Sequence, residues 1–177
     1  MIEVHKIQDS STGVFTFEQY LKNGELHRDP NEGPALVRRT SQGTGIVIAH
    51  FWKGKLHSPD YGPAITEFNV GDIMPRKKGW FRHGFLHSTR GPAVWSLFKN
   101  NDGGANVGLT DAYFVHGYNY RDPEQGPKLI HRDWQTGNTT VCQFTSKKKF
   151  IGPTPSEADL SKLFRRRADR STYDLLP

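Results

Sequence analysis

The chain carries four copies of one short motif, and this repetition restricts its fold more than any other feature of the sequence. The clearest copy begins at Trp52-Lys53-Gly54-Lys55-Leu56-His57 and ends at Gly62-Pro63-Ala64. The turn glycines of the four copies stand 30, 30 and 33 residues apart, at Gly24, Gly54, Gly84 and Gly117. A Gly-Pro pair closes each copy, at Gly33, Gly62, Gly91 and Gly126. A period of about 30 residues is typical of repeat proteins, whose units are stabilised mainly by their nearest neighbours.

The segments between the copies have the composition of β-hairpins. Residues 35–39 and 46–52 are rich in β-formers and flank a turn over 40–45, and the same plan returns after each Gly-Pro pair. Within the motif, Asn23-Gly24 is a strong tight-turn signal because both residues tolerate positive φ. The pattern predicts a mainly β protein, an elongated, twisted antiparallel sheet of about five stacked β-hairpins joined by the four motif copies.

The C-terminal part of the chain has a different composition. Residues 147–177 hold eight Lys/Arg and four Asp/Glu, whereas residues 1–146 hold sixteen and fourteen. We therefore expect a hairpin-repeat array over 1–146 and a basic C-terminal segment over 147–177. Ser156 is a helix N-cap candidate, and apolar side chains recur at helical spacing after it. These signals predict a short helix over about 157–168 that caps the last hairpin.

A single cysteine and the lack of long apolar runs bear on the compartment. Cys142 cannot form an intrachain disulfide or a cysteine-based zinc site within one chain, and we expect it to be a small buried side chain. The sequence has no apolar run approaching the roughly 18 residues that span a bilayer. The N-terminus lacks the basic-then-apolar pattern of a signal peptide. These features favour a cytoplasmic protein without a membrane span.

The motif resembles that of a known group of proteins. Residues 23–35, 53–64 and 83–93 match N-G-x-L-H-R-x-x-G-P-A, and the fourth copy departs from it at Asn119, Tyr120 and Lys128. This pattern is similar to that of bacterial and phage hairpin-repeat proteins, a divergent relation of MORN-type repeats. The resemblance implies a non-catalytic scaffold, since such arrays are associated with protein contacts, self-association and sometimes lipid headgroups. It transfers no catalytic residue, because the repeat defines none.

Three histidines occupy the same place in successive copies of the motif. Equivalent positions in neighbouring hairpins lie roughly 9–10 Å apart, whereas a metal needs its ligand nitrogens about 2.1 Å away. His27, His57 and His87 therefore cannot converge on one ion. We expect each ring to hydrogen-bond the backbone of a connector and to stack on a neighbouring aromatic ring. The sequence accordingly predicts neither a metal site nor a cofactor.

The sequence contains no G-x-S-x-G nucleophile motif, no H-E-x-x-H zinc-hydrolase motif and no Gly-Lys-Ser/Thr phosphate loop. Asp29, Asp60 and Asp122 recur beside the connector prolines, and this regularity favours turn capping over acid–base chemistry. We expect that the protein is not an enzyme. A hydrolase that uses His and Asp of the connectors stays as a third hypothesis.

Two sets of side chains are candidates for binding a partner. The aromatic set, which we expect on an exposed sheet face, is Trp52, Trp80, Phe81 and Tyr113. The basic set in the C-terminal segment is Lys147, Lys148, Arg165, Arg166 and Arg167. The expected function is a protein-interaction module, and the resemblance extends this to a phage-encoded inhibitor or an antitoxin-like partner of a host protein. A homodimer through the aromatic face is a further expectation, and the alternative function is nucleic-acid binding by the basic segment.

Overall fold

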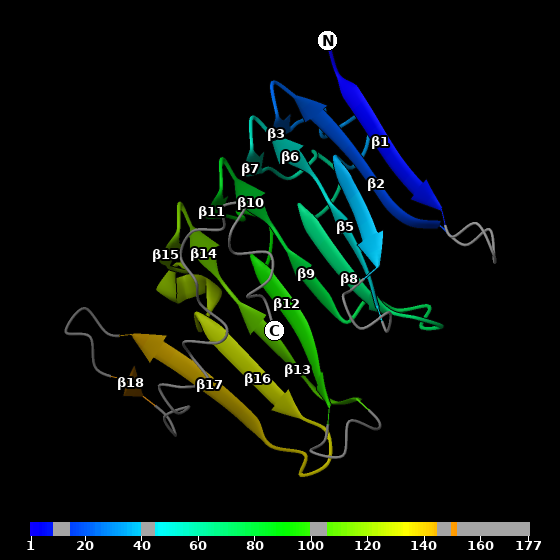
Figure 1. The fold of residues 1–177 in the computed structure, drawn as a ribbon. Coiled ribbons are helices and arrows are strands. Elements are labelled where there is room, and N and C mark those ends of the chain that lie inside the picture. Colours follow the sequence, from blue (N-terminus) through cyan, green and yellow to red (C-terminus); the bar gives the residue numbers. More distant parts are fainter. Residues whose placement is uncertain (9–14, 40–44, 100–105, 145–149, 152–177) are drawn as a thin grey trace.

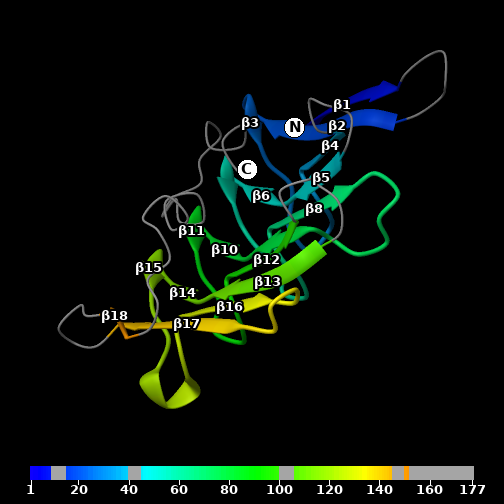
Figure 2. The same ribbon diagram turned by 90° about the horizontal axis from the view of Figure 1, so that it is seen from below.

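The protein is built mainly from one antiparallel β-sheet, as predicted. A computed structural model describes residues 1–8, 15–39, 45–99, 106–144 and 150–151. The sheet follows the order of the chain, and every neighbouring pair is antiparallel. Its long strands are β1 (Glu3–Gln8), β2 (Phe15–Lys22), β4 (Leu36–Arg39), β5 (Gly45–Ala49), β8 (Ile65–Asn69), β9 (Lys77–Gly79), β12 (Val94–Lys99), β13 (Asn106–Ala112), β16 (Leu129–Asp133) and β17 (Thr139–Phe144), followed by the short β18 (Phe150–Ile151). They form successive hairpins that step along the sheet from β1 to β18 (Figures 1 and 2).

The four motif copies are connectors between these hairpins. We define the connectors as residues 20–35, 50–64, 80–93 and 113–128. Each contains a short hairpin that lies beside one end of the long strands (Figure 1). These hairpins are made by the end of β2 with β3 (Glu25–Leu26), by β6 (Phe51–Trp52) with β7 (Lys55–Leu56), by β10 (Phe81–Arg82) with β11 (Phe85–Leu86), and by β14 (Phe114–Val115) with β15 (Tyr118–Asn119). The two residues of each tight turn have positive φ, for example 53° at Asn23 and 75° at Gly24. Positive φ at both central residues is the geometry that suits a two-residue hairpin.

The core lies between one face of the sheet and the connectors. Directly opposed residues form one row across eight strands, namely Leu36, Ala49, Ile65, Gly79, Val94, Ala112, Leu129 and Cys142. The connectors contribute equivalent apolar side chains to the same core cluster, namely Leu26, Leu56, Leu86, Phe51, Phe81 and Phe114. Leu56 is 1% exposed and Phe51 is fully buried. Each hairpin therefore buries its apolar face against the connectors, and the core runs continuously from one repeat to the next.

The strands that enter the connectors are shorter than the apolar pattern indicates. The sequence predicts one continuous strand over 46–52, but β5 ends at Ala49 and β6 begins at Phe51. His50 is the residue at which the chain passes from the main sheet to the connector hairpin. Its amide donates to the Ala64 carbonyl at 2.7 Å, in register with the β5–β8 ladder, and its carbonyl accepts from the His57 amide at 3.1 Å within the connector.

The described residues contain one 3-10 turn, η1 (Pro123–Gln125), and no α-helix. Within them there is accordingly no helix long and apolar enough to cross a bilayer. The predicted helix over 157–168 and the basic side chains Lys147, Lys148, Arg165, Arg166 and Arg167 lie outside the described residues. Cys142 is 2% exposed, which confirms the prediction of a small buried side chain.

Candidate binding groove

The connectors dock on one another through a repeated set of backbone bonds. From the second connector on, the amide of the turn glycine donates to the leucine carbonyl of the preceding connector, at 2.9 Å from Gly54 to Leu26 and 2.8 Å from Gly84 to Leu56. The amide of residue 28, 58 or 88 donates in return to the buried phenylalanine carbonyl of the following connector, at 2.8 to 3.1 Å. The connectors therefore form a second bonded layer beside the main sheet.

The three equivalent histidines add a side-chain bond at each of these junctions. The Nδ1 atom of His57 accepts from the His83 amide at 3.3 Å, and the two rings lie 4.5 Å apart. His87 and His116 repeat this arrangement at 3.2 Å and 4.5 Å. The predicted role in connector bonding and ring stacking is thus confirmed. Burial lowers the pKa of His57 and of His87, which favours the neutral ring that such an acceptor requires.

A groove of about 1030 Å³ runs over the first three connectors. It is lined by residues 29–31, 57–63, 80–83 and 87–90, with Trp52 and Lys78. The side chains of Trp52, Trp80 and the 72% exposed Tyr61 give it aromatic walls. We call this feature the connector groove.

The connector groove carries charges of both signs. Arg82 and Arg90 are exposed cations, and Lys78 lies with its Nζ atom 5.3 Å from the centroid of the Trp95 ring. Asp29 and Asp60 supply the carboxylates. Charges of both signs on aromatic walls suit the mixed side chains of a protein surface.

The connector aspartates also cap turns or link connectors. The Asp29 carboxylate accepts from the Asn31 amide at 2.9 Å, and the Asp122 carboxylate accepts from the Glu124 amide at 3.0 Å. These two bonds confirm the predicted turn capping. Asp60 instead accepts from the Asn31 side-chain amide at 3.0 Å, which joins the first two connectors.

The structure brings together three of the four aromatic residues predicted to bind a partner. Trp52, Trp80 and Phe81 all line the connector groove, but Phe81 is only 5% exposed and belongs to the core. Trp52 also stacks on His27, with ring centroids 4.5 Å apart. Tyr113 lies in the fourth connector and does not line the groove. The aromatic surface is therefore on the connectors and not on the open face of the sheet, because the connector phenylalanines fill the core.

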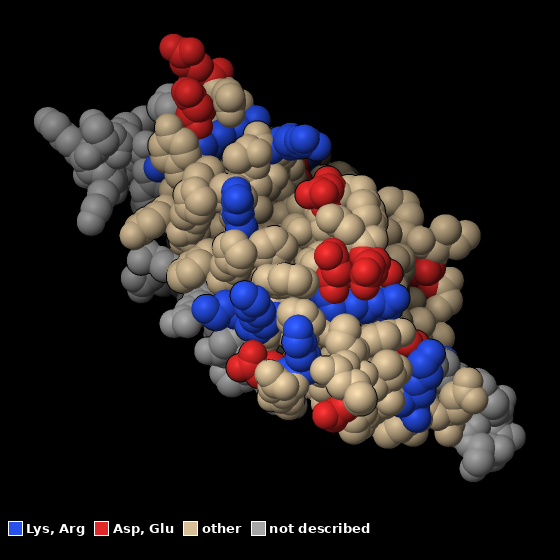
Figure 3. All heavy atoms as spheres, turned by 90° about the horizontal axis from the view of Figure 1, so that it is seen from above, with Lys and Arg blue, Asp and Glu red and all other residues tan. Residues whose placement is uncertain are grey.

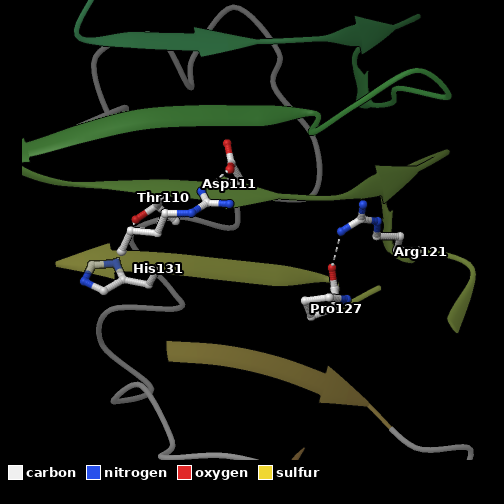
Figure 4. Close-up of polar contacts among 6 residues, drawn as sticks. Thr110, Asp111, Arg121, Pro127 and His131 are labelled. Carbon is white, nitrogen blue, oxygen red and sulfur yellow. Dashed lines mark hydrogen bonds and ion pairs between the residues drawn. The ribbon is translucent and has the colours of Figure 1, made fainter. Parts of the chain in front are cut away.

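The fourth connector shows how the Tyr113 ring is covered. The Arg121 guanidinium lies 3.9 Å from the centroid of the Tyr113 ring. Its Nη1 atom donates to the Pro127 carbonyl at 3.1 Å (Figure 4). Figure 4 also shows polar side chains of the neighbouring strands, where the Thr110 hydroxyl oxygen lies 2.9 Å from the Nδ1 atom of His131.

Several groove residues are absent from the sequence-based prediction. Tyr61 and Arg90 line the groove from two loops and Arg82 lines it from strand β10, and no single motif copy indicates that these positions converge. The recurrence of the motif is the signal that could have revealed them, because equivalent segments of neighbouring repeats lie side by side. One face of the molecule shows Lys/Arg and Asp/Glu interspersed (Figure 3), as expected from the near balance of charge over 1–146.

The chain has no significant match to a protein-family model, a curated protein sequence or a solved structure. The described residues contain no group of three or more His, Cys, Asp or Glu placed to hold a metal ion. The candidate site is an open groove with aromatic walls and charges of both signs.

Proposed function

We propose that the protein is a non-enzymatic protein-interaction module that binds its partner in the connector groove. The observation that carries the proposal is the convergence of Trp52, Trp80 and Tyr61 with exposed arginines in one groove of about 1030 Å³. Aromatic side chains and arginine are enriched where proteins bind one another and contribute most of the binding energy there. The connector bonds hold these groups on a preorganised backbone, which lowers the entropic cost of binding.

The state of the buried cysteine agrees with a non-enzymatic role. Burial raises the pKa of the Cys142 thiol, and the side chain is 2% exposed. A thiol in this setting is a poor nucleophile, because the thiolate is the reactive form.

The repeat motif extends the proposal to origin and partner class. We propose that the array is MORN-like, is capped by a helix over 157–168 and acts in the cytoplasm. In this proposal the chain is a phage-encoded inhibitor or an antitoxin-like protein, and its partner is a host protein. This extension is supported by the resemblance of residues 23–35, 53–64 and 83–93 to that motif.

A pair of charge-matched variants tests the groove. Arg82→Glu with Arg90→Glu reverses two exposed groove charges, whereas Lys55→Glu with Lys99→Glu makes the same change in net charge outside the groove. A partner is first captured with the full chain from the cells in which it is expressed, then purified and titrated by calorimetry. We expect the groove variant to lose affinity by about a hundredfold and the control to keep it within about threefold. Equal losses in the two variants would exclude the groove as the binding surface.

The alternative, nucleic-acid binding, rests on the basic composition of residues 147–177. It makes a different prediction for the same preparation. Affinity for a DNA or RNA oligonucleotide would fall steeply with salt and disappear when residues 147–177 are deleted. Under this alternative, reversing Arg82 and Arg90 would have no larger effect than reversing Lys55 and Lys99.

A further inference from the structure

Four ring positions in the connectors are equivalent in their backbone bonding, and they hold Tyr20, His50, Trp80 and Tyr113. The amide at this position donates to the carbonyl of the residue after the Gly-Pro pair, at 2.7 to 2.9 Å in all four connectors. The carbonyl at this position accepts from the residue three places after the turn glycine, at 2.9 to 3.1 Å. The surroundings of these four rings can therefore be compared directly.

In the first and fourth connectors an arginine of the same repeat covers the ring. The Arg28 guanidinium lies 4.2 Å from the Tyr20 centroid, and the Arg121 guanidinium lies 3.9 Å from the Tyr113 centroid. Arg28 also donates to the Pro34 carbonyl at 3.3 Å, in the same way that Arg121 donates to Pro127. The motif therefore contains a built guanidinium site, which consists of an aromatic face and a proline carbonyl.

In the third connector the position of Arg28 is taken by Ser88, and the ring is Trp80. Gly91 follows its turn glycine by seven residues, whereas Gly33 follows its own by nine. A Cβ atom placed on Gly33 would lie 2.9 Å from the Arg28 guanidinium carbon, but one placed on Gly91 would meet no atom within 4 Å. Among the described residues, no Lys or Arg side chain lies over the Trp80 ring. Trp80 and Ser88 instead both line the connector groove.

The second connector is different, because its ring already has a partner. His50 contacts the Pro30 carbonyl through Nδ1 at 3.1 Å. Ser58 occupies the arginine position there and accepts from the Phe81 amide at 3.0 Å. Of the four equivalent rings, Trp80 is thus the one that lies in the connector groove without an arginine of its own repeat over its face.

The charges around this site define the ligand further. Asp29 and Asp60 in the same groove attract a cation, whereas Arg82 and Arg90 attract an anion. A ligand that satisfies both carries a guanidinium next to a carboxylate. We propose that the ring face of Trp80 binds an arginine side chain of the partner protein, presented beside an acidic residue in an exposed loop. This inference rests on the proposed function and names the contact through which the groove recognises its partner.

Arginine is favoured over lysine as the ligand, because the equivalent rings Tyr20 and Tyr113 are each covered by an arginine. A planar guanidinium can lie over the indole face and still donate to a backbone carbonyl, as Arg28 and Arg121 do over their tyrosine rings. Stacking on the larger indole is also stronger than stacking on a phenol ring. Pro92 takes the place in the third connector that Pro34 and Pro127 take in the first and fourth, so that its carbonyl would accept from the guanidinium of the ligand.

The test uses the full chain with ¹⁵N-labelled tryptophan and a blocked Arg-Asp dipeptide as the probe. The reference probe is a blocked citrulline-Asp dipeptide, which has the same shape but no charge. We expect the Trp80 indole signal, assigned from its loss in Trp80→Leu, to shift with the Arg-Asp probe and to need about tenfold more of the citrulline probe. Ser88→Arg places a guanidinium at the position of Arg28 and should abolish the shift, whereas Trp134→Leu, which removes an exposed tryptophan outside the groove, should preserve it.

Three outcomes would overturn the inference. They are equal binding of the two dipeptides, a shift that survives Ser88→Arg in a folded variant, and binding of an oligothymidine at Trp80 in place of the dipeptide. The proposed function fails separately. If the purified partner still depends on Arg82 and Arg90 while no dipeptide binds, the groove is the interface and Trp80 is not its arginine site.

Discussion

The Nδ1 atom of His27 accepts a hydrogen bond from the Lys53 amide at 3.1 Å, so that one side chain joins two consecutive connectors. His57 and His87 make the same bond to the next connector. A ring nitrogen that accepts a bond cannot carry a proton. Protonation of these rings therefore weakens the contacts between repeats.

Stability should fall as the pH falls below 6.5. Burial lowers the pKa of His27, His57 and His87 from the ordinary value of 6.5. Because the unfolded chain then takes up protons before the folded chain does, the contribution of these histidines to the free energy of unfolding is fully present above about pH 7.5 and declines below 6.5 until the folded rings titrate. Urea unfolding between pH 8 and pH 5 measures this decline.

The control for the pH experiment is the double variant His57→Gln with His87→Gln. It removes two of the three titrating junctions and should flatten the profile. His50 keeps its own buried ring, whose pKa burial also lowers, and sets part of the slope that remains. A profile as steep as that of the unaltered chain would show that the junction histidines do not cause the decline.

Asn119→Leu should stabilise the protein by about 1 kcal/mol. Asn119 takes the place that leucine holds in the other connectors, and its buried Oδ1 atom has no hydrogen-bond partner. The gain is reduced by loss of the bond from its Nδ2 atom to the Tyr113 carbonyl, at 3.2 Å. The reverse change, Leu86→Asn, should cost about 3 kcal/mol, because it buries an amide where Leu86 is 3% exposed. A destabilised Asn119→Leu variant in thermal unfolding would contradict the prediction.

Gly24→Ala should cost about 1 kcal/mol although the site has open space. Gly24 has a φ of +75°, which strains any residue with a Cβ atom, and an added Cβ would meet nothing within 4 Å. Gly62→Ala is the matched control. Its φ lies outside this region and its nearest neighbour would be Pro59 Cγ at 3.8 Å, so that we expect a change within about 0.5 kcal/mol. Equal costs in urea titrations of the two variants would contradict the role given to φ.

Arg28→Ser and Arg121→Ser should each destabilise the protein by about 1 kcal/mol, through loss of the ring contact and the bond to a proline carbonyl. The two sites lie in the first and fourth connectors and share no contact. Their effects should therefore add within about 0.5 kcal/mol in the double variant. If the double variant loses clearly more stability in equilibrium unfolding than the sum of the two single variants, distant repeats are coupled beyond their neighbours.

The repeat period made much of the fold predictable. The spacing of the turn glycines placed the connectors, and the Asn23-Gly24 pair identified the geometry that Lys53, His83 and His116 also adopt with φ near 50°. The strand break at His50 was not predicted, because a composition rich in β-formers continues through it. At His50 the amide still bonds Ala64 of the main sheet while the carbonyl bonds the His57 amide of the connector, and no local pattern reports this change of partner.

The binding surface was only partly predictable. Trp52 and Trp80 could be named because large aromatic side chains stand out in the motif, but Phe81 beside them is a core residue. Local sequence does not separate the two cases, since adjacent strand residues point to opposite faces and the facing layer decides which is buried. The substitution of Ser88 for arginine acquires meaning only once the Trp80 ring and the groove are seen together.

The regular row of opposed residues from Leu36 to Cys142 also fixes the distance between equivalent positions of neighbouring repeats. Neighbouring repeats are offset by two strand spacings, roughly 9–10 Å, which is close to the length of three residues of an extended chain. A partner segment in the polyproline II conformation, with three residues per turn and a rise of about 3.1 Å per residue, would therefore present every third side chain to an equivalent position along the connectors. Adding or removing one repeat would change the reach of the array by one such step and leave the pitch of its contacts intact.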